Sequence, residues 1–261
     1  MAMCPHPDQQ AVDYANEYLS NALSIGEQML RSGAEVSRVE DSIRRVCLAY
    51  GAERVDVFTI TSSIVVTISG KAFGTVTQTR RISGLQFDLR RLERLNELSR
   101  LIAERLPPMA TVESALERIR STPSHSFPAQ LAIWALVSAT FTLFFGGSWR
   151  DAIASAIIGV LLKCVDAGLK WLELNSFLAA LLCSGFGGLL SFLAVQWGLG
   201  DSVEKINIGN IMLLIPGIML TNSLRDLFNG DTISGLLRFL EAVLLSMTIA
   251  AGFVAASVIG G

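Results

Sequence analysis

Four stretches in the second half of the chain contain no charged residue at all. They cover residues 129–149, 174–200, 206–224 and 242–261. About 20 mostly apolar residues are needed for a helix to cross a bilayer, and each stretch meets or nearly meets that length. A fifth segment, 152–169, is apolar until Lys163 and Asp166 near its end. We therefore predict five transmembrane helices, at roughly 129–146, 151–169, 177–199, 206–224 and 239–259.

The charged residues gather in the first half of the chain. Residues 1–125 hold 15 Lys and Arg and 15 Asp and Glu, whereas the remaining 136 residues hold 6 and 8. This shift predicts a soluble domain over residues 1–125 and a transmembrane helical domain over residues 126–261. Neither half has the basic excess that nucleic-acid binding requires, so we expect no nucleic-acid partner.

The first half alternates between two periodicities. An apolar face recurs at helical spacing over 11–30 and again over 37–50, where Ser37 and Glu40 match a capping box. Residues rich in β-branched side chains then predict two or three short antiparallel strands, at about 54–60, 63–69 and 73–80. Apolar residues at helical spacing return over residues 85–106, and Pro107 ends that predicted helix. A shorter helix is predicted near 111–120. We expect a small α+β domain ahead of an α-helical polytopic membrane bundle.

The distribution of Lys and Arg between the predicted loops sets the orientation. If the soluble domain is cytoplasmic, the inner helix ends and loops carry Lys163, Lys170, Arg225 and Arg238, and the outer loops carry only Arg150 and Lys205. The positive-inside rule therefore favours a cytoplasmic N-terminal domain. The short fourth span would reverse the fifth if it were re-entrant.

The fourth predicted span is interrupted at its centre by Pro216 and Gly217. Proline has no N–H, so the carbonyl of Met212 loses its helical partner. Carbonyls freed inside a membrane must be satisfied by protein or water, and transporters use such breaks to present backbone groups to a substrate. Candidate substrate contacts are therefore Asn210, Pro216, Gly217, Thr221 and Asn222. The alternative is a structural proline kink without a ligand.

Two pairs of charged residues lie at the ends of predicted spans. Lys163 and Asp166 are three residues apart near the end of the second span, and Arg225 and Asp226 close the fourth. Ionisable residues in spans often serve transport, so we take these four as candidates for charge or proton handling. The alternative is that they reach the membrane surface as solvated pairs.

Enzymatic signals are weak. The four cysteines are scattered and there are two histidines, so we expect no metal site, no cofactor and no histidine-based catalysis. The string Gly-Leu-Gly-Asp at 198–201 matches the G-x-G-D of aspartyl intramembrane proteases. That chemistry needs two aspartates at membrane depth. Asp201 is expected in an outer loop and Asp166 near the opposite face, so we predict that the chain is not an enzyme.

Several strings resemble the threonine/serine exporter family, in its N-terminal half. They are "SGAEVSRVEDSIRRVCLAYG", "VDVFTITSSIVVTIS" and "NIMLLIPGIMLTNSLRDLFNGDTISGLLRFLEAVLLSMTIAAG". The similarity runs from about residue 12 to 256. The last string is the most specific, because its asparagine, Pro-Gly, Asn-Ser-x-x-Asp and Gly-Asp elements follow the order of the family.

The resemblance implies a secondary exporter in the inner membrane, and we expect it to export a small polar metabolite with the energy of the proton gradient. Members of the family are assigned to threonine and serine export or to dicarboxylate (succinate) export. The resemblance also implies a second membrane component, which split members encode as a separate, smaller protein. We expect an exporter subunit for threonine or serine acting with such a partner. Dicarboxylate export and a non-transporting sensor or assembly subunit are the alternatives.

Overall fold

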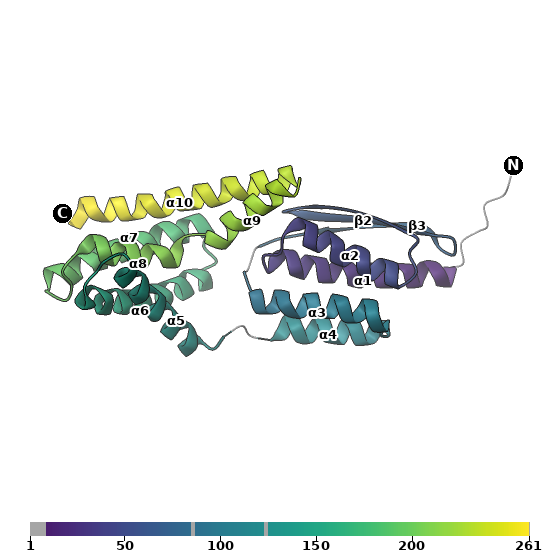
Figure 1. Ribbon diagram of the computed structural model, residues 1–261, viewed down its shortest axis with the longest axis horizontal. Coiled ribbons are helices and arrows are strands. Elements are labelled where there is room, and N and C mark those ends of the chain that lie inside the picture. Colours follow the sequence, from purple (N-terminus) through teal and green to yellow (C-terminus); the bar gives the residue numbers. More distant parts are fainter. Residues whose placement is uncertain (1–8, 85–86, 123–124, 261) are drawn as a thin grey trace. The chain divides into compact units, whose positions relative to one another are not determined.

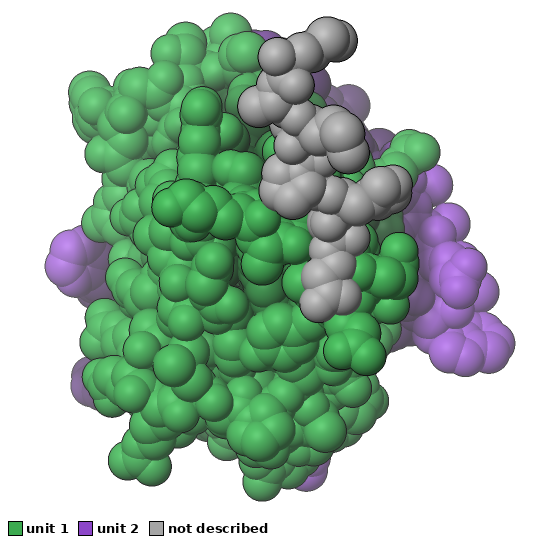
Figure 2. Space-filling view, turned by 90° about the vertical axis from the view of Figure 1, so that its right-hand side faces the viewer, with its two compact units in different colours: residues 1–124, 218–239 green, residues 125–217, 240–261 purple. Residues whose placement is uncertain are grey.

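The computed structural model describes residues 9–84, 87–122 and 125–260 (Figure 1). The chain divides into two compact units, which Figure 2 distinguishes by colour. Residues 1–124 and 218–239 form one, here called the N-terminal unit; residues 125–217 and 240–261 form the other, here called the helical unit. Cys4 and His6 lie outside the described residues.

The N-terminal unit contains the two predicted amphipathic helices, the strands that follow them and further helices from both ends of the chain. Its helices are α1 (Gln9–Arg31), α2 (Val36–Ala49), α3 (Leu89–Arg105), α4 (Met109–Ser121), most of α9 (Gly217–Phe228) and the start of α10 (Thr232–Gly260). Gly33 and Gly51 follow α1 and α2 with φ of 95° and 102°. Only glycine adopts such angles without strain, which explains why the first two helices end where the sequence predicts.

The three predicted strands form one antiparallel sheet in the order β1-β2-β3. The strands are β1 (Arg54–Ile60), β2 (Ser63–Gly70) and β3 (Gly74–Arg81). Ile64, Val66 and Ile68 of the central strand are fully buried. Alternate residues of a strand share a face, so these three place one face of the sheet against α1 and α2. Helices α3 and α4 pack on the other side of α1 and α2 (Figure 1).

The helical unit is a bundle of apolar helices. It contains α5 (Phe127–Phe144), α6 (Trp149–Trp171), α7 (Ser176–Gln196), α8 (Val203–Leu214) and the larger part of α10. Within the described residues, four helices are long and apolar enough to cross a membrane, namely α5, α6, α7 and α10. The pair α8 and α9 gives a fifth if it counts as one broken span. The prediction of a polytopic helical bundle after an α+β region is confirmed.

The fourth predicted span is two helices. Helix α8 ends at Leu214, Ile215 takes an extended conformation with φ −59° and ψ 131°, and α9 begins at Gly217. The ring of Pro216 disfavours the helical conformation for the residue before it, and Ile215 leaves the helix. The break predicted at Pro216 and Gly217 is therefore present as a true interruption.

Small residues allow the helices of the helical unit to approach closely. A side chain at Gly252 of α10 would place its Cβ 2.7 Å from the Leu181 carbonyl oxygen of α7, and one at Gly188 would meet Ala256 at 2.6 Å. Both distances are below van der Waals contact. The small-residue pairs Ser184/Gly188 and Gly252/Ala256 thus line the interface of α7 and α10, as the spacing predicts.

Replacing Gly252 by leucine should destabilise the protein by at least about 1–3 kcal/mol, because the new side chain overlaps the α7 backbone. The measurement is the thermal unfolding midpoint of the full chain in detergent. Gly168→Leu is the matched control, since nothing lies within 4 Å of a Cβ built at that position. Equal midpoints for the two variants would contradict the packing of α7 and α10.

Candidate functional site

A buried polar cluster lies among α5, α6 and α8 in the helical unit. Asn210 of α8 is 0 % exposed, and its Oδ1 accepts a hydrogen bond of 2.7 Å from the hydroxyl of Ser138 on α5. Ser138 also contacts the hydroxyl and the carbonyl oxygen of Ser155 on α6. We call Ser138, Ser155 and Asn210 the serine–asparagine cluster. It joins three helices through uncharged hydrogen-bonding groups.

The backbone beside Asn210 explains how the cluster forms. A Cβ at Gly209 would lie 2.7 Å from the Ser138 carbonyl oxygen and 2.8 Å from the Ser155 hydroxyl. Only glycine lets α8 come this near to α5 and α6. The Thr142 hydroxyl donates to the same Ser138 carbonyl at 2.9 Å, so it does not compete for the Asn210 side chain.

The amides of α8 retain unused hydrogen-bonding capacity. Within the described residues, the Nδ2 of Asn210 and the Oδ1 of Asn207 are buried without a hydrogen-bond partner. The two residues are three apart and therefore on one face of α8. Buried amide groups almost always have partners, because leaving one unsatisfied costs about 1–3 kcal/mol. One donor and one acceptor on this face are available to a polar ligand or to water.

A charged cluster lies further along α6. The ammonium groups of Lys163 and Lys170 both contact one carboxylate oxygen of Asp166, each at 2.9 Å. Lys163 is only 8 % exposed, and its ammonium lies 5.1 Å from the centre of the Trp134 ring. The predicted contact between Lys163 and Asp166 is present. Lys170 adds a second cation, so the group carries a net positive charge.

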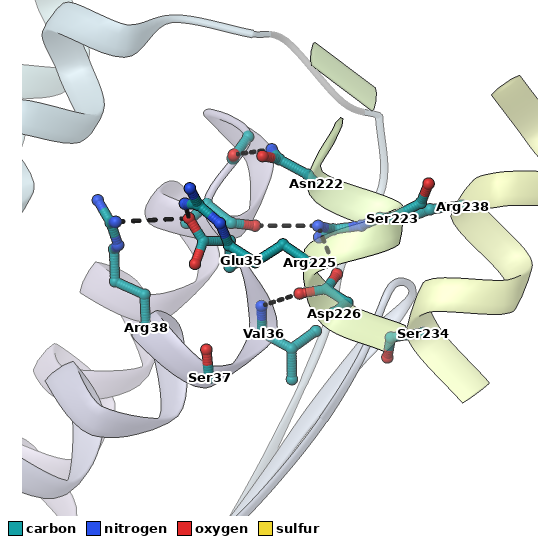
Figure 3. Close-up of polar contacts among 12 residues, drawn as sticks. Glu35, Val36, Ser37, Arg38, Asn222, Ser223, Arg225, Asp226, Ser234 and Arg238 are labelled. Carbon is teal, nitrogen blue, oxygen red and sulfur yellow. Dashed lines mark hydrogen bonds and ion pairs between the residues drawn. The ribbon is translucent and has the colours of Figure 1, made fainter. Parts of the chain in front are cut away.

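The remaining charged candidates, Arg225 and Asp226 of α9, belong to the N-terminal unit and contact the residues where α2 begins (Figure 3). Asp226 of α9 is fully buried, and its carboxylate accepts from the Val36 N–H and from Arg238 of α10, each at 3.0 Å. Arg238 is 3 % exposed and also donates to the Ala34 carbonyl at 3.1 Å. We call Val36, Asp226 and Arg238 the aspartate network. Asp226 and Arg238 are thus a buried ion pair, not solvated residues at a membrane surface.

Two further α9 side chains bind the same turn between α1 and α2 (Figure 3). The amide of Asn222 donates to the Gly33 carbonyl at 2.7 Å, and Arg225 forms an ion pair with Glu35. These contacts support a structural role for Asn222, Arg225 and Asp226. Thr221 lies on the same helix and is exposed.

The aspartate network corrects the predicted capping box. Helix α2 begins at Val36, one residue before Ser37, and its N-cap Glu35 makes no side-chain cap hydrogen bond. The Asp226 carboxylate takes the first free N–H instead, where the helix dipole favours a negative charge. Glu40 accepts from the Thr59 N–H of β1 at 2.9 Å and so ties α2 to the sheet.

Ionisation of Glu40 opposes folding. Burial raises the pKa of Glu40 above its ordinary 4.5; the Thr59 hydrogen bond opposes this shift, and the charge of Asp231 adds to it. A carboxyl whose pKa is raised in the folded state stabilises the fold fully below its ordinary pKa. That contribution is lost as the pH rises through the raised value.

We therefore expect Glu40→Gln to reduce the fall in the unfolding midpoint between acidic and neutral pH. Glutamine keeps an oxygen acceptor for the Thr59 N–H and cannot ionise. The measurement is the thermal midpoint of the full chain in detergent across this pH range. Asp41→Asn, at the adjacent exposed position, should leave the pH profile unchanged, and an identical effect of both variants would contradict the assignment.

The Gly-x-Gly-Asp string forms a structural turn. Asp201 accepts from the Ser148 hydroxyl at 2.6 Å and pairs with Arg150 at 3.1 Å, both at the start of α6. Its own N–H donates to the buried carboxylate of Asp151. Asp166 is 16 residues further along α6 than Arg150, or about 24 Å at the helical rise. The two aspartates are therefore not a protease dyad, as expected.

The predicted site residues thus fall into separate clusters. Asn210 lies in the serine–asparagine cluster, Lys163 and Asp166 lie on α6, and Asn222 and Asp226 bind the start of α2. Space is open around Gly217, where nothing lies within 4 Å of a built Cβ. Sequence reasoning missed Ser138 as the partner of Asn210. Its only signal was a polar residue four positions before Thr142 in an apolar helix.

Comparisons with known proteins agree with this layout. The ThrE family model, described as "Putative threonine/serine exporter", matches residues 20–260. The threonine/serine exporter of Corynebacterium glutamicum is 26 % identical over 239 residues, which are 88 % of this chain and 49 % of that protein. The chain therefore spans about half the length of this relative. No solved structure matches the chain.

Another group of relatives has about the same length as this chain. The "Probable succinate transporter subunit YjjP" of Klebsiella aerogenes is 24 % identical over 243 residues, which are 89 % of this chain and 90 % of that protein. The protein of the same name from Escherichia coli is 23 % identical and is covered over 93 % of its length.

Proposed function

This chain belongs to the threonine/serine exporter family, and from that premise we propose that it is one subunit of a two-component secondary exporter for threonine or serine in the cell inner membrane. Its composition and family make it a multi-pass membrane protein. Relatives of its own length are named transporter subunits, which supports a second, small membrane subunit. The excess of Lys and Arg in the predicted inner segments supports a cytoplasmic N-terminal unit.

The serine–asparagine cluster is the observation that carries the proposal. Transporter binding sites are commonly formed at discontinuous helices, and the unpartnered donor of Asn210 lies on α8, the helix that ends at the break before Pro216. The groups around it are uncharged hydrogen bonders. They suit the hydroxyl and the ammonium or carboxylate of a hydroxy amino acid, whose net charge is zero. Pro216 and Gly217 of the same unit would add contacts from the break.

Asp166 is the proposed group for coupling to the proton gradient. Its carboxylate holds two lysines, one of them nearly buried. Protonation of the carboxylate would release both ammonium groups and change the charge at this end of α6. Such a change favours one conformation over another, which is how a proton gradient drives a secondary transporter.

Export of a dicarboxylate such as succinate is the second candidate. The two lysines around Asp166 leave a net positive charge that would attract a dianion. The charge-removing variant Lys163→Met separates the two candidates. It should reduce succinate export strongly, and threonine export to a smaller extent.

The proposal is tested in cells that lack their own exporters and are loaded with a threonine-containing dipeptide. Expression of this chain with its partner subunit should lower intracellular threonine and raise it in the medium, and expression of this chain alone should do so less. Succinate-loaded cells serve as the parallel arm. Normal membrane insertion without efflux of either solute would favour the sensor or assembly role.

A further inference from the structure

The chain contains three tyrosines, and all three line one pocket of the N-terminal unit. Tyr14 and Tyr18 come from α1, Tyr50 follows α2, and Phe73 comes from the turn between β2 and β3. The pocket has a volume of about 270 Å³. Pockets for drug-sized ligands begin at about 300 Å³, so this one suits a smaller molecule.

The rings form apolar walls at right angles. Tyr14 stands edge-on to Tyr18 and Tyr50, with interplanar angles of 72° and 86°. Tyr18 and Tyr50 stack with their centroids 5.8 Å apart, and Phe73 meets Tyr18 edge-on. Perpendicular aromatic walls accommodate an alkyl or aromatic side chain by burial and edge-to-face contact.

One polar atom at this pocket is unexplained. Tyr18 is 1 % exposed, and its hydroxyl has no hydrogen-bond partner in the described part of the chain. By contrast, the Tyr50 hydroxyl donates to the Pro107 carbonyl at 2.6 Å. Because the Tyr18 hydroxyl is itself buried, the charged groups that the pocket offers to a ligand are those of Glu53 and Lys71.

The remaining polar lining carries one charge of each sign. Glu53 and Lys71 both line the pocket and are exposed, and their charged groups lie 3.8 Å apart. An exposed pair at this distance contributes little to stability, so it can open to other partners at little cost. Glu53 matches an ammonium group and Lys71 matches a carboxylate.

We infer that this pocket is a binding site for an α-amino acid with an apolar side chain, held by its charged ends between Glu53 and Lys71 and by its side chain among the tyrosines. The site lies in the N-terminal unit, apart from the serine–asparagine cluster. It is a ligand site of the soluble region and not a transport site. The inference does not depend on the transported substrate.

The tyrosines themselves supply the test. Uniform fluorotyrosine labelling of the full chain gives fluorine NMR signals from the three tyrosines that line the pocket. We expect L-phenylalanine, added to the protein in detergent, to shift these signals saturably. Phenethylamine, which lacks the carboxylate, and phenylpropionate, which lacks the ammonium, should bind about two- to fivefold more weakly, because each loses a contact with one exposed charge.

Variants at the two charged positions complete the experiment. Glu53→Gln and Lys71→Gln should each weaken L-phenylalanine binding about two- to fivefold, since both charges are exposed. Glu93→Gln and Arg100→Gln are the controls, since these residues line a separate cleft between α2 and α3, and they should change nothing. The inference is overturned if no saturable shift occurs at millimolar ligand, if either analogue binds as tightly as the amino acid, or if the four variants behave alike.

Discussion

Replacing Asp226 by alanine should lower the free energy of unfolding by about 3–5 kcal/mol, the cost of leaving one partner of a buried ion pair alone. Arg238 is 3 % exposed and would lose its carboxylate, and the Val36 N–H at the start of α2 would lose its acceptor. The measurement is denaturant unfolding of the full chain in detergent, followed by circular dichroism.

Two further variants separate charge from packing. Asp226→Asn keeps an oxygen for the Val36 N–H and should cost less than alanine. The double variant Asp226→Leu with Arg238→Met removes both charges and should recover much of the lost stability, because a buried pair can be replaced by apolar groups. Asp41→Ala removes an exposed ion pair with Arg44 and should cost about 0–1 kcal/mol. An Asp226→Ala effect no larger than that would contradict the aspartate network.

Replacing Asn210 by leucine should reduce export roughly tenfold to a hundredfold. The variant removes the hydrogen-bonding groups proposed to contact the substrate, and a hydrogen bond to a charged group contributes about 1.5–3 kcal/mol. Leucine has a similar size, so the contact of α8 with α5 and α6 should survive. The measurement is the initial rate of threonine efflux, normalised to the amount of folded protein in the membrane.

Ser191→Ala is the matched control for Asn210→Leu. Ser191 is also a buried polar residue of the helical unit, but its hydroxyl donates to the Gly187 carbonyl of its own helix. Its removal should leave efflux unchanged. Equal efflux in the two variants, at equal expression, would contradict the role of the serine–asparagine cluster.

The elements that local chemistry determines could be predicted from the sequence. The alternation of β-branched residues and the turn after Gly70 predicted the hairpin of β2 and β3 with nearly correct ends. The break in the fourth span could be predicted from Pro216, because a proline disfavours the helical conformation of the residue directly before it. The spacing of Gly252 and Ala256 gave a packing face of α10.

Contacts between distant residues could not be predicted in this way. The start of α2 depends on Asp226, which lies 190 residues after Val36. The fifth span was expected to begin near residue 239, whereas helix α10 begins at Thr232 and contains Arg238, which pairs with Asp226. Ser138 and Asn210 are 72 residues apart, and the sequence around either residue does not indicate that the two form a hydrogen bond. Periodicity describes a face of one element and carries no information about its partner.

The most direct test of the account is solute flux through the purified exporter. The complex would be isolated from its native membranes through a tag on this chain and reconstituted in liposomes with labelled threonine or succinate. We predict that threonine leaves the vesicles, that an imposed proton gradient accelerates it, and that Asn210→Leu reduces this gradient-driven efflux about tenfold to a hundredfold. Gradient-driven threonine efflux that is unaffected by Asn210→Leu, or no flux of either solute, would contradict the account.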